Sequence, residues 1–144
     1  MKFESSIVIN RPVENVWAYM ADFKNMPVWS PDTVETRITS EGPVQKGTTY
    51  VWIGQSMGRR IEVNAKVTEF EVNRGWGYQS VSGPFVSSAR FALESANGGT
   101  RVTVSEEADV SGFFKLAEPV IARMGKRQMD TGLANLKDVL EAQH

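Results

Sequence analysis

The strongest constraint on the fold is a run of strand-like segments joined by short connectors between residues 33 and 110. Turn-forming residues fill these connectors, which read EGPVQKG, GQSMG, NRG, SGP and ANGG. A parallel crossover takes a dozen or more residues, so connectors this short favour antiparallel pairing. We expect strands at residues 33–40, 48–54, 59–72, 75–81, 85–95 and 100–110.

A strand and a helix are predicted ahead of this run. Apolar and polar residues alternate over 3–10, which is typical of a strand with one buried face. In the following stretch, Asn10 is the expected N-cap and Pro12 lies in the first turn of a helix near 12–21. The apolar stripe of that helix has the spacing i, i+3, i+4, i+7 and consists of Val13, Val16, Trp17 and Met20.

The C-terminal 32 residues are helical in pattern. Apolar residues recur at helical spacing as Phe113, Ala117, Val120, Ile121, Met124, Met129, Leu133, Leu136 and Leu140. Pro119 is expected to start or kink the regular helix. Gly125 and Gly132 are seven residues apart and share a face, where they either let the backbone pass close to a neighbour or face solvent.

The order of elements is therefore one strand, two short helices, six strands and one long helix. This order predicts an α+β fold in which one long helix can lie across a curved antiparallel sheet of about seven strands. A chain of 144 residues fits one domain, so we expect residues 1–144 to form a single domain.

Charge and composition narrow the function classes. The 16 Lys+Arg balance 17 Asp+Glu, which argues against a nucleic-acid partner because such proteins usually present a basic face. No stretch approaches 18 apolar residues, so no integral membrane association is expected. The N-terminal sequence has no apolar core of a signal peptide, and cysteine is absent, so we expect a cytoplasmic protein.

Three sequence segments resemble a known superfamily. They are IVINRPVENVWAYMADFKNMPVWSPDTV near the start, GGTRVTVSEE, and LANLKDVLE near the end. Together with the order of elements they resemble the START-like (SRPBCC) superfamily, and within it the polyketide cyclase/dehydrase-like group. The resemblance implies a helix-grip fold, in which the curved sheet wraps around the long C-terminal helix. It also implies a deep apolar cavity between sheet and helix, in which members bind lipids, hormones or polyketides. It implies no fixed metal or cofactor.

The residues themselves also favour a site without metal or cofactor. The single histidine is the last residue, His144, and there is no cysteine, so neither a catalytic Ser–His–Asp arrangement nor a zinc site is expected. The glycines of GQSMGRR lack the GK[ST] ending of a phosphate-binding loop.

Glu106 is the best candidate for polar chemistry in the interior. In TRVTVSEEADV it shares its strand parity with Val102, Val104, Ala108 and Val110, so its side chain should point inward. A buried carboxylate is either paired or has a raised pKa. Glu106 is therefore a weak candidate for a catalytic acid or base or for a ligand anchor, and the alternative is a salt-bridged or bulged glutamate.

Aromatic and apolar residues complete the predicted ligand site. Trp and Tyr suit the wall of an apolar pocket because each also carries a polar group. The inward face of strand 48–54 is ambiguous, since Tyr50 and Trp52 compete with Val51 and Ile53. The candidate ligand-binding residues are Trp29, Tyr50, Trp52, Tyr78, Phe91, Glu106, Phe114, Val120, Met124 and Gln128.

The segment KNMPVWSP at residues 24–31 frames one tryptophan with two prolines. Pro27 and Pro31 limit helix here to a short turn near 22–29. The resemblance implies that this segment lies beside the C-terminal helix, so Trp29 should be at least half buried against it. Its ring either closes the core or also touches a ligand.

Three function hypotheses follow from these observations. The first is a protein that binds a small hydrophobic molecule and acts as a monomer or homodimer. The second is a polyketide cyclase/aromatase- or dehydratase-like enzyme that uses the same cavity. The third is a protein-interaction module related to cochaperones, which would have a filled interior and a large exposed apolar patch.

Overall fold

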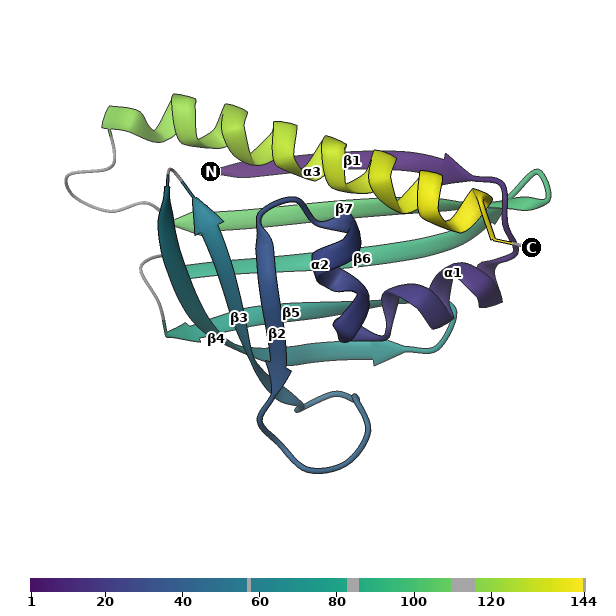
Figure 1. Cartoon of the computed structure of the whole chain (residues 1–144), viewed down its shortest axis with the longest axis horizontal. Helices are drawn as coiled ribbons and strands as arrows, with labels where there is room; N and C mark the ends of the chain where they lie inside the picture. Colours follow the sequence, from purple (N-terminus) through teal and green to yellow (C-terminus); the bar gives the residue numbers. More distant parts are fainter. Residues whose placement is uncertain (57, 83–85, 110–115, 144) are drawn as a thin grey trace.

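A computed structural model of the chain describes residues 1–56, 58–82, 86–109 and 116–143. Seven strands form one sheet, and a long helix lies over one side of it (Figure 1). In chain order the elements are β1 (Lys2–Ile9), α1 (Val13–Met20), the 3₁₀ turn η1 (Phe23–Asn25), α2 (Met26–Trp29), β2 (Thr33–Ile38), β3 (Thr49–Ser56), β4 (Arg59–Glu71), β5 (Gly75–Ser82), β6 (Val86–Ala96), β7 (Gly99–Asp109) and α3 (Glu118–Glu141).

Every neighbouring pair of strands in the sheet is antiparallel, as the short connectors predict. The strand order is β1-β7-β6-β5-β4-β3-β2, so consecutive strands are neighbours except that β1 pairs with β7. Helix α3 runs along β1 and also contacts α2. The predicted helix-grip fold is confirmed, and its two short helices and α3 lie on the same side of the sheet (Figure 1).

Two residues connect β6 and β7 in a tight hairpin. Its two turn residues, Asn97 and Gly98, have φ angles of 50° and 82°. Positive φ at both central residues is the geometry of a type I′ turn, which matches the twist of the two flanking strands. The ANGG sequence therefore predicts this hairpin correctly.

The first helix differs from the prediction at its N-terminus. Val16, Trp17 and Met20 are buried as the periodicity indicates. Asn10 does not cap the helix, however, because Pro12 occupies the N-cap position and makes no side-chain capping bond. The backbone N–H of Asn10 instead donates to the Glu141 carboxylate at 2.8 Å, which joins the end of β1 to the end of α3.

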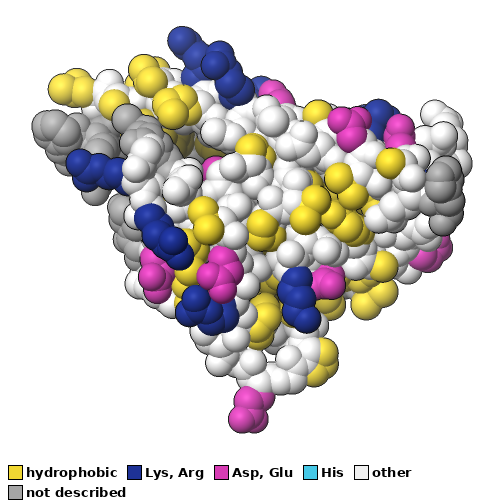
Figure 2. All heavy atoms as spheres, in the orientation of Figure 1, with side chains coloured by type: hydrophobic (Ala, Val, Ile, Leu, Met, Phe, Trp, Pro, Cys, Tyr) yellow, Lys and Arg dark blue, Asp and Glu magenta, His cyan; other side chains and the backbone are white. Residues whose placement is uncertain are grey.

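Helix α3 buries its C-terminal half and exposes much of its N-terminal half. Its buried residues are Gly132, Leu133, Leu136 and Leu140. Val120 and Met124 are 58% and 38% exposed, and Leu116 just before the helix is 96% exposed. Figure 2 shows hydrophobic and basic side chains together over this part of the molecule. The apolar run read from the sequence therefore does not form one continuous buried stripe.

The two interior glycines of α3 face close neighbours rather than solvent. A Cβ at Gly125 would lie 2.8 Å from Cζ of the Phe3 ring on β1. A Cβ at Gly132 would lie 3.5 Å from the Trp29 carbonyl oxygen and 3.6 Å from the Trp29 ring. Both glycines lie where the helix backbone approaches another element, as one of the two sequence interpretations predicts. Within the described residues, no helix has the length and apolar character needed to cross a membrane.

Candidate ligand-binding site

Glu106 faces the same side of the sheet as the hydrophobic core. On β7 the side chains of Val102, Val104 and Ala108 are buried, and Glu106 shares their parity. The residue after it, Glu107, points to the other face, where it forms an exposed ion pair with Lys2 at 3.2 Å. Period-two alternation thus places one glutamate inside and its neighbour outside, as predicted.

A single cross-strand row carries Glu106 and Tyr78. The register pairs Val67 with Tyr78, Tyr78 with Ala89, Ala89 with Glu106, and Glu106 with Phe3. Directly paired residues project from the same face of an antiparallel sheet. Ala89 has the smallest side chain of this row, so only a methyl group stands between Tyr78 and Glu106 on this face of the sheet.

The environment of Glu106 disfavours its charged form. Burial raises the pKa of Glu106 from its ordinary value of 4.5 to about 7, and the negative charge of Asp32 contributes in the same direction. Asp32 itself accepts a hydrogen bond from Ser30 at 3.0 Å. Within the described parts of the chain no Lys or Arg pairs with Glu106, so the salt-bridged alternative is not observed. Glu106 can therefore gain or lose a proton near neutral pH.

Two tyrosines lie beside this carboxyl. Burial, followed by the charge of Glu106, raises the pKa of Tyr78 well above its usual value, while a hydrogen bond with Ser87 acts in the opposite direction. Tyr50 is 3% exposed, and burial also raises its pKa. The two rings meet edge to face with their centroids 6.3 Å apart. Tyr78 and Glu106 are surrounded by protein yet keep some exposed surface, which is expected of side chains that line a hollow.

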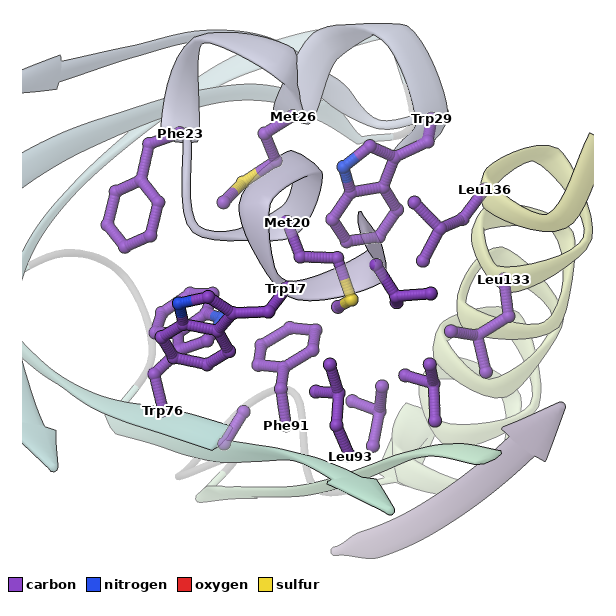
Figure 3. Close-up of a cluster of buried hydrophobic side chains, with 14 of the residues drawn as sticks. Trp17, Met20, Phe23, Met26, Trp29, Trp76, Phe91, Leu93, Leu133 and Leu136 are labelled. Carbon is purple, nitrogen blue, oxygen red and sulfur yellow. The ribbon is translucent and has the colours of Figure 1, made fainter. Parts of the chain in front are cut away.

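A cluster of aromatic rings lies next to the tyrosines, between the sheet and the short helices. Trp76 stacks on Phe91 at 4.6 Å with 8° between the ring planes, and Phe23 packs on Trp76 at 4.6 Å. Figure 3 shows Trp76 and Phe91 rising from the sheet toward Phe23 and Trp29, which descend from η1 and α2. The buried indole N–H groups of Trp29 and Trp76 have no hydrogen-bond partner among the described residues. The rings from the sheet and the rings from the short helices thus form two apolar layers beside the row of Tyr78, Ala89 and Glu106.

The inward face of β3 carries Tyr50 and Trp52. Tyr50 belongs to the hydrophobic core, and Trp52 packs against it. The indole N–H of Trp52 donates to Thr33 Oγ1 at 2.8 Å, and its ring covers the backbone of Gly54, where any Cβ would overlap it. Val51 and Ile53 are buried as well, but they lie on the opposite parity and outside this core.

Trp29 is buried against α3, as the sequence predicts. Its side chain is 6% exposed, and its ring meets Phe91 edge to face at 6.3 Å. Asn135 of α3 donates to the Trp29 carbonyl oxygen at 3.2 Å, and Gly132 lies against the ring. Figure 3 shows the indole between α2 and Leu136 of α3. These contacts are those of a residue that closes the core.

Three predicted ligand residues on α3 are not brought to Glu106. Val120, Met124 and Gln128 are exposed in this structure, and Phe114 lies outside the described residues. The basic side chains of this helix half do not reach Glu106 either. Lys126, for example, donates to Ser5 at 3.1 Å and pairs with Asp130 at 3.4 Å.

Two surface hollows are found among the described residues. One of about 520 Å³ is lined by Lys2 and Phe3 of β1 and by residues between 122 and 131 of α3, and the other, of about 200 Å³, lies where β5, β6 and β7 adjoin near Ser87 and Ala108. Neither is lined by Glu106 or Tyr78. In the described residues, no group of His, Asp and Glu side chains is arranged to hold a metal ion.

Sequence reasoning missed two residues of the site. Asp32 follows Pro31 in an irregular stretch, where no periodicity indicates the direction of a side chain. Ala89 shares its parity with Phe91, but its importance as the small member of the row depends on the register of three strands. Only the second of these residues had a local signal.

Comparison with known proteins assigns the family. The model of the family described as polyketide cyclase / dehydrase and lipid transport matches residues 1–141. The chain belongs to this family. No curated protein sequence matches the chain.

Many solved structures share the fold of this member of the polyketide cyclase / dehydrase family. The three described next have low sequence identity to it. TTHA0849 from Thermus thermophilus has a TM-score of 0.86 at 15% identity, covering 99% of this chain and 98% of that one. The ZhuI aromatase/cyclase from Streptomyces sp. R1128 has a TM-score of 0.80 at 15% identity, with 98% and 93% covered. A START superfamily protein from Mycobacterium smegmatis has a TM-score of 0.79 at 14% identity, with 97% of both covered. At these identities the likeness establishes the fold.

Proposed function

We propose that this protein binds a small hydrophobic molecule between the inner face of the sheet and helix α3. The polar end of the ligand lies at Glu106 and Tyr78, and its apolar body lies against the aromatic rings beside them. Family membership supports this type of function. The observation that carries it is the row in which Ala89 separates Tyr78 from Glu106 on the inner face of the sheet.

The physical argument concerns the cost of an unpaired polar group in a core. A carboxyl without a cationic partner among the described residues weakens a protein unless it contacts water or a ligand. Apolar burial would then supply most of the affinity, at roughly 25 cal/mol per Å² before the cost of ordering the ligand.

Native mass spectrometry of the freshly purified protein tests this function directly. We expect a mass above that of the chain, which disappears after denaturation and extraction with organic solvent. The extracted protein should then bind an apolar fluorescent probe with one-to-one stoichiometry, and replacement of Ala89 by Leu should weaken that binding by filling the row. An extracted protein that binds no apolar probe would contradict the proposal.

An enzyme of the aromatase/cyclase or dehydratase type is the second candidate. It is supported by the pKa of Glu106, which at about 7 suits a group that both takes up and releases a proton at neutral pH. Turnover of a bound polyketide-like chain that Glu106→Gln lowers by a factor of about 100 would support this candidate. Unchanged turnover would remove Glu106 from the mechanism.

The third hypothesis, a cochaperone-like interaction module, has weaker support. The exposed Leu116, Val120 and Met124 form an apolar surface that such a module could use. Its interior should be filled, however, whereas Tyr78 and Glu106 each keep exposed surface within the fold. If the extracted protein binds no apolar probe, the interaction module becomes the best supported of the three hypotheses.

A further inference from the structure

Among the residues that the structure describes, the polar groups beside Glu106 contain oxygen but no cationic nitrogen. Glu106 contributes a carboxyl, Tyr78 and Tyr50 contribute hydroxyls, and Asp32 is close enough for its charge to act on both Glu106 and Tyr78. The charged groups that act on Glu106 and Tyr78 are thus carboxylates of the same sign. Arg90 of the neighbouring strand β6 pairs with Glu69 at 2.5 Å instead of with Glu106.

The Tyr50 hydroxyl gives a second and independent sign of a ligand. Tyr50 is only 3% exposed, yet no residue in the described segments forms a hydrogen bond with its hydroxyl. The centroid of its ring lies 6.3 Å from that of Tyr78, so Tyr50 is a neighbour of the row that carries Tyr78 and Glu106. The hydroxyl of this largely buried side chain is not among the fully enclosed unpaired polar atoms of the described residues, so it is open to a hydrogen bond with water or with a ligand.

These two observations discriminate between classes of ligand. A carboxylate ligand would bring a third negative charge next to Glu106 and Asp32, which costs binding energy in a poorly hydrated space. A pure hydrocarbon would leave the Tyr50 hydroxyl and the Glu106 carboxyl without partners. A protonated amine would pair with Glu106 and donate to the tyrosine oxygens, and aromatic rings attract a cation placed over their faces.

We infer that the ligand is a hydrophobic amine, cationic at neutral pH, whose nitrogen donates to the Glu106 carboxylate beside Tyr78 and Tyr50. This inference rests on the proposed function, because it assigns the polar end of the same ligand. The apolar body extends from the row toward Trp52 and the Trp76–Phe91 stack.

Three probes with one apolar body and different charges test the inference. They are 2-(1-naphthyl)ethylamine, 2-(1-naphthyl)ethanol and 1-naphthylacetate, whose binding to the extracted protein is measured by calorimetry at pH 8. We expect the amine to bind at least tenfold more tightly than the alcohol, and the carboxylate to bind most weakly. In Glu106→Gln the amine and the alcohol should bind alike.

Matched variants separate charge from folding. Glu106→Asp keeps the carboxylate and should retain the preference for the amine. Glu107→Gln changes the next residue of the strand, which lies on the outer face in an exposed pair with Lys2, and should bind all three probes as the original protein does. Circular dichroism checks that each variant folds.

The possible outcomes lead to different conclusions. Equal binding of the three probes would overturn the inference while leaving a hydrophobic ligand site in place. An amine preference that survives in Glu106→Gln would overturn the assignment to Glu106. Binding of none of the probes would overturn the proposed function itself, and with it the inference.

Discussion

Tyr78 and Glu106 lie on the same face of the sheet and are separated in their cross-strand row by Ala89 alone. Burial raises the pKa of Tyr78, and the negative charge of Glu106 raises it further. This pair lies on the same side of the sheet as the hydrophobic core, in a chain whose family is described as polyketide cyclase / dehydrase and lipid transport. Its properties lead to the first prediction.

Stability should decrease as the pH rises through the titration range of Glu106. The pKa of Glu106 is about 7 in the folded protein and near 4.5 when the chain is unfolded, so the folded state holds more protons between these values. Unfolding then releases a proton, and the free energy of unfolding decreases with pH by up to about 3 kcal/mol over this window. Chemical denaturation at pH 4.5, 6 and 8 measures it.

The control for this prediction is the same titration in Glu106→Gln. The amide has no charge to bury, so the decrease between pH 4.5 and 7 should become smaller than in the original protein. Glu107→Gln, on the outer face, should keep the decrease. If the free energy of unfolding changes with pH in the same way in all three proteins, folding does not raise the pKa of Glu106.

The Trp29 ring should contribute to stability rather than to binding. It is buried between α2, α3 and Phe91, so Trp29→Ala should lower the free energy of unfolding by about 3–5 kcal/mol. Val28→Ala, at an exposed neighbouring position, should have little effect. If Trp29→Ala folds and its apolar-probe affinity falls more than tenfold, the ring also touches the ligand.

Much of the fold could be predicted from the sequence because its signals are local. The ANGG turn fixes the β6–β7 register, and the alternation around Glu106 fixes which glutamate points inward. The face of β3 could not be fixed in this way. Val51 and Ile53 are apolar and buried on one parity while Tyr50 and Trp52 are on the other, so a pattern of polarity alone does not separate the two faces.

The ligand site is harder to predict because it depends on relationships between distant segments. Glu106 carries a local signal, whereas Asp32 acts on it from the irregular segment after α2. Helix periodicity also places Val120 and Met124 with the buried residues of α3, although that half of the helix extends where little of the sheet covers it. Periodicity reports which residues share a face, but it does not report how far the facing surface extends.

The β6–β7 turn should depend on the left-handed conformation of Asn97. Asparagine tolerates a φ of 50°, but alanine at this position should lower the free energy of unfolding by about 1–2 kcal/mol. Asn97→Gly adopts positive φ freely and should stay close to the original stability. Thermal unfolding of the two variants measures the difference, and equal midpoints for both would contradict the assignment of the turn.

The glycines of α3 should respond differently to the same substitution. Alanine is favoured over glycine by about 1 kcal/mol in a helix interior. At Gly132 the added Cβ makes ordinary contacts at 3.5 Å and beyond, so Gly132→Ala should be stabilising or neutral. At Gly125 the Cβ would lie 2.8 Å from the Phe3 ring, so overpacking by about 1–3 kcal/mol should cancel or exceed the gain.

A double-mutant cycle between Gly125 and Phe3 tests the cause of this difference. Phe3→Leu shortens the side chain that the new methyl group meets, so Gly125→Ala should be better tolerated in the Phe3→Leu background than in the original protein. Urea denaturation of the four proteins gives the coupling energy, which should favour the double variant by at least about 0.5 kcal/mol. A coupling of zero would mean that the helix does not approach β1 through Phe3, and the packing of α3 on the edge strand would need another explanation.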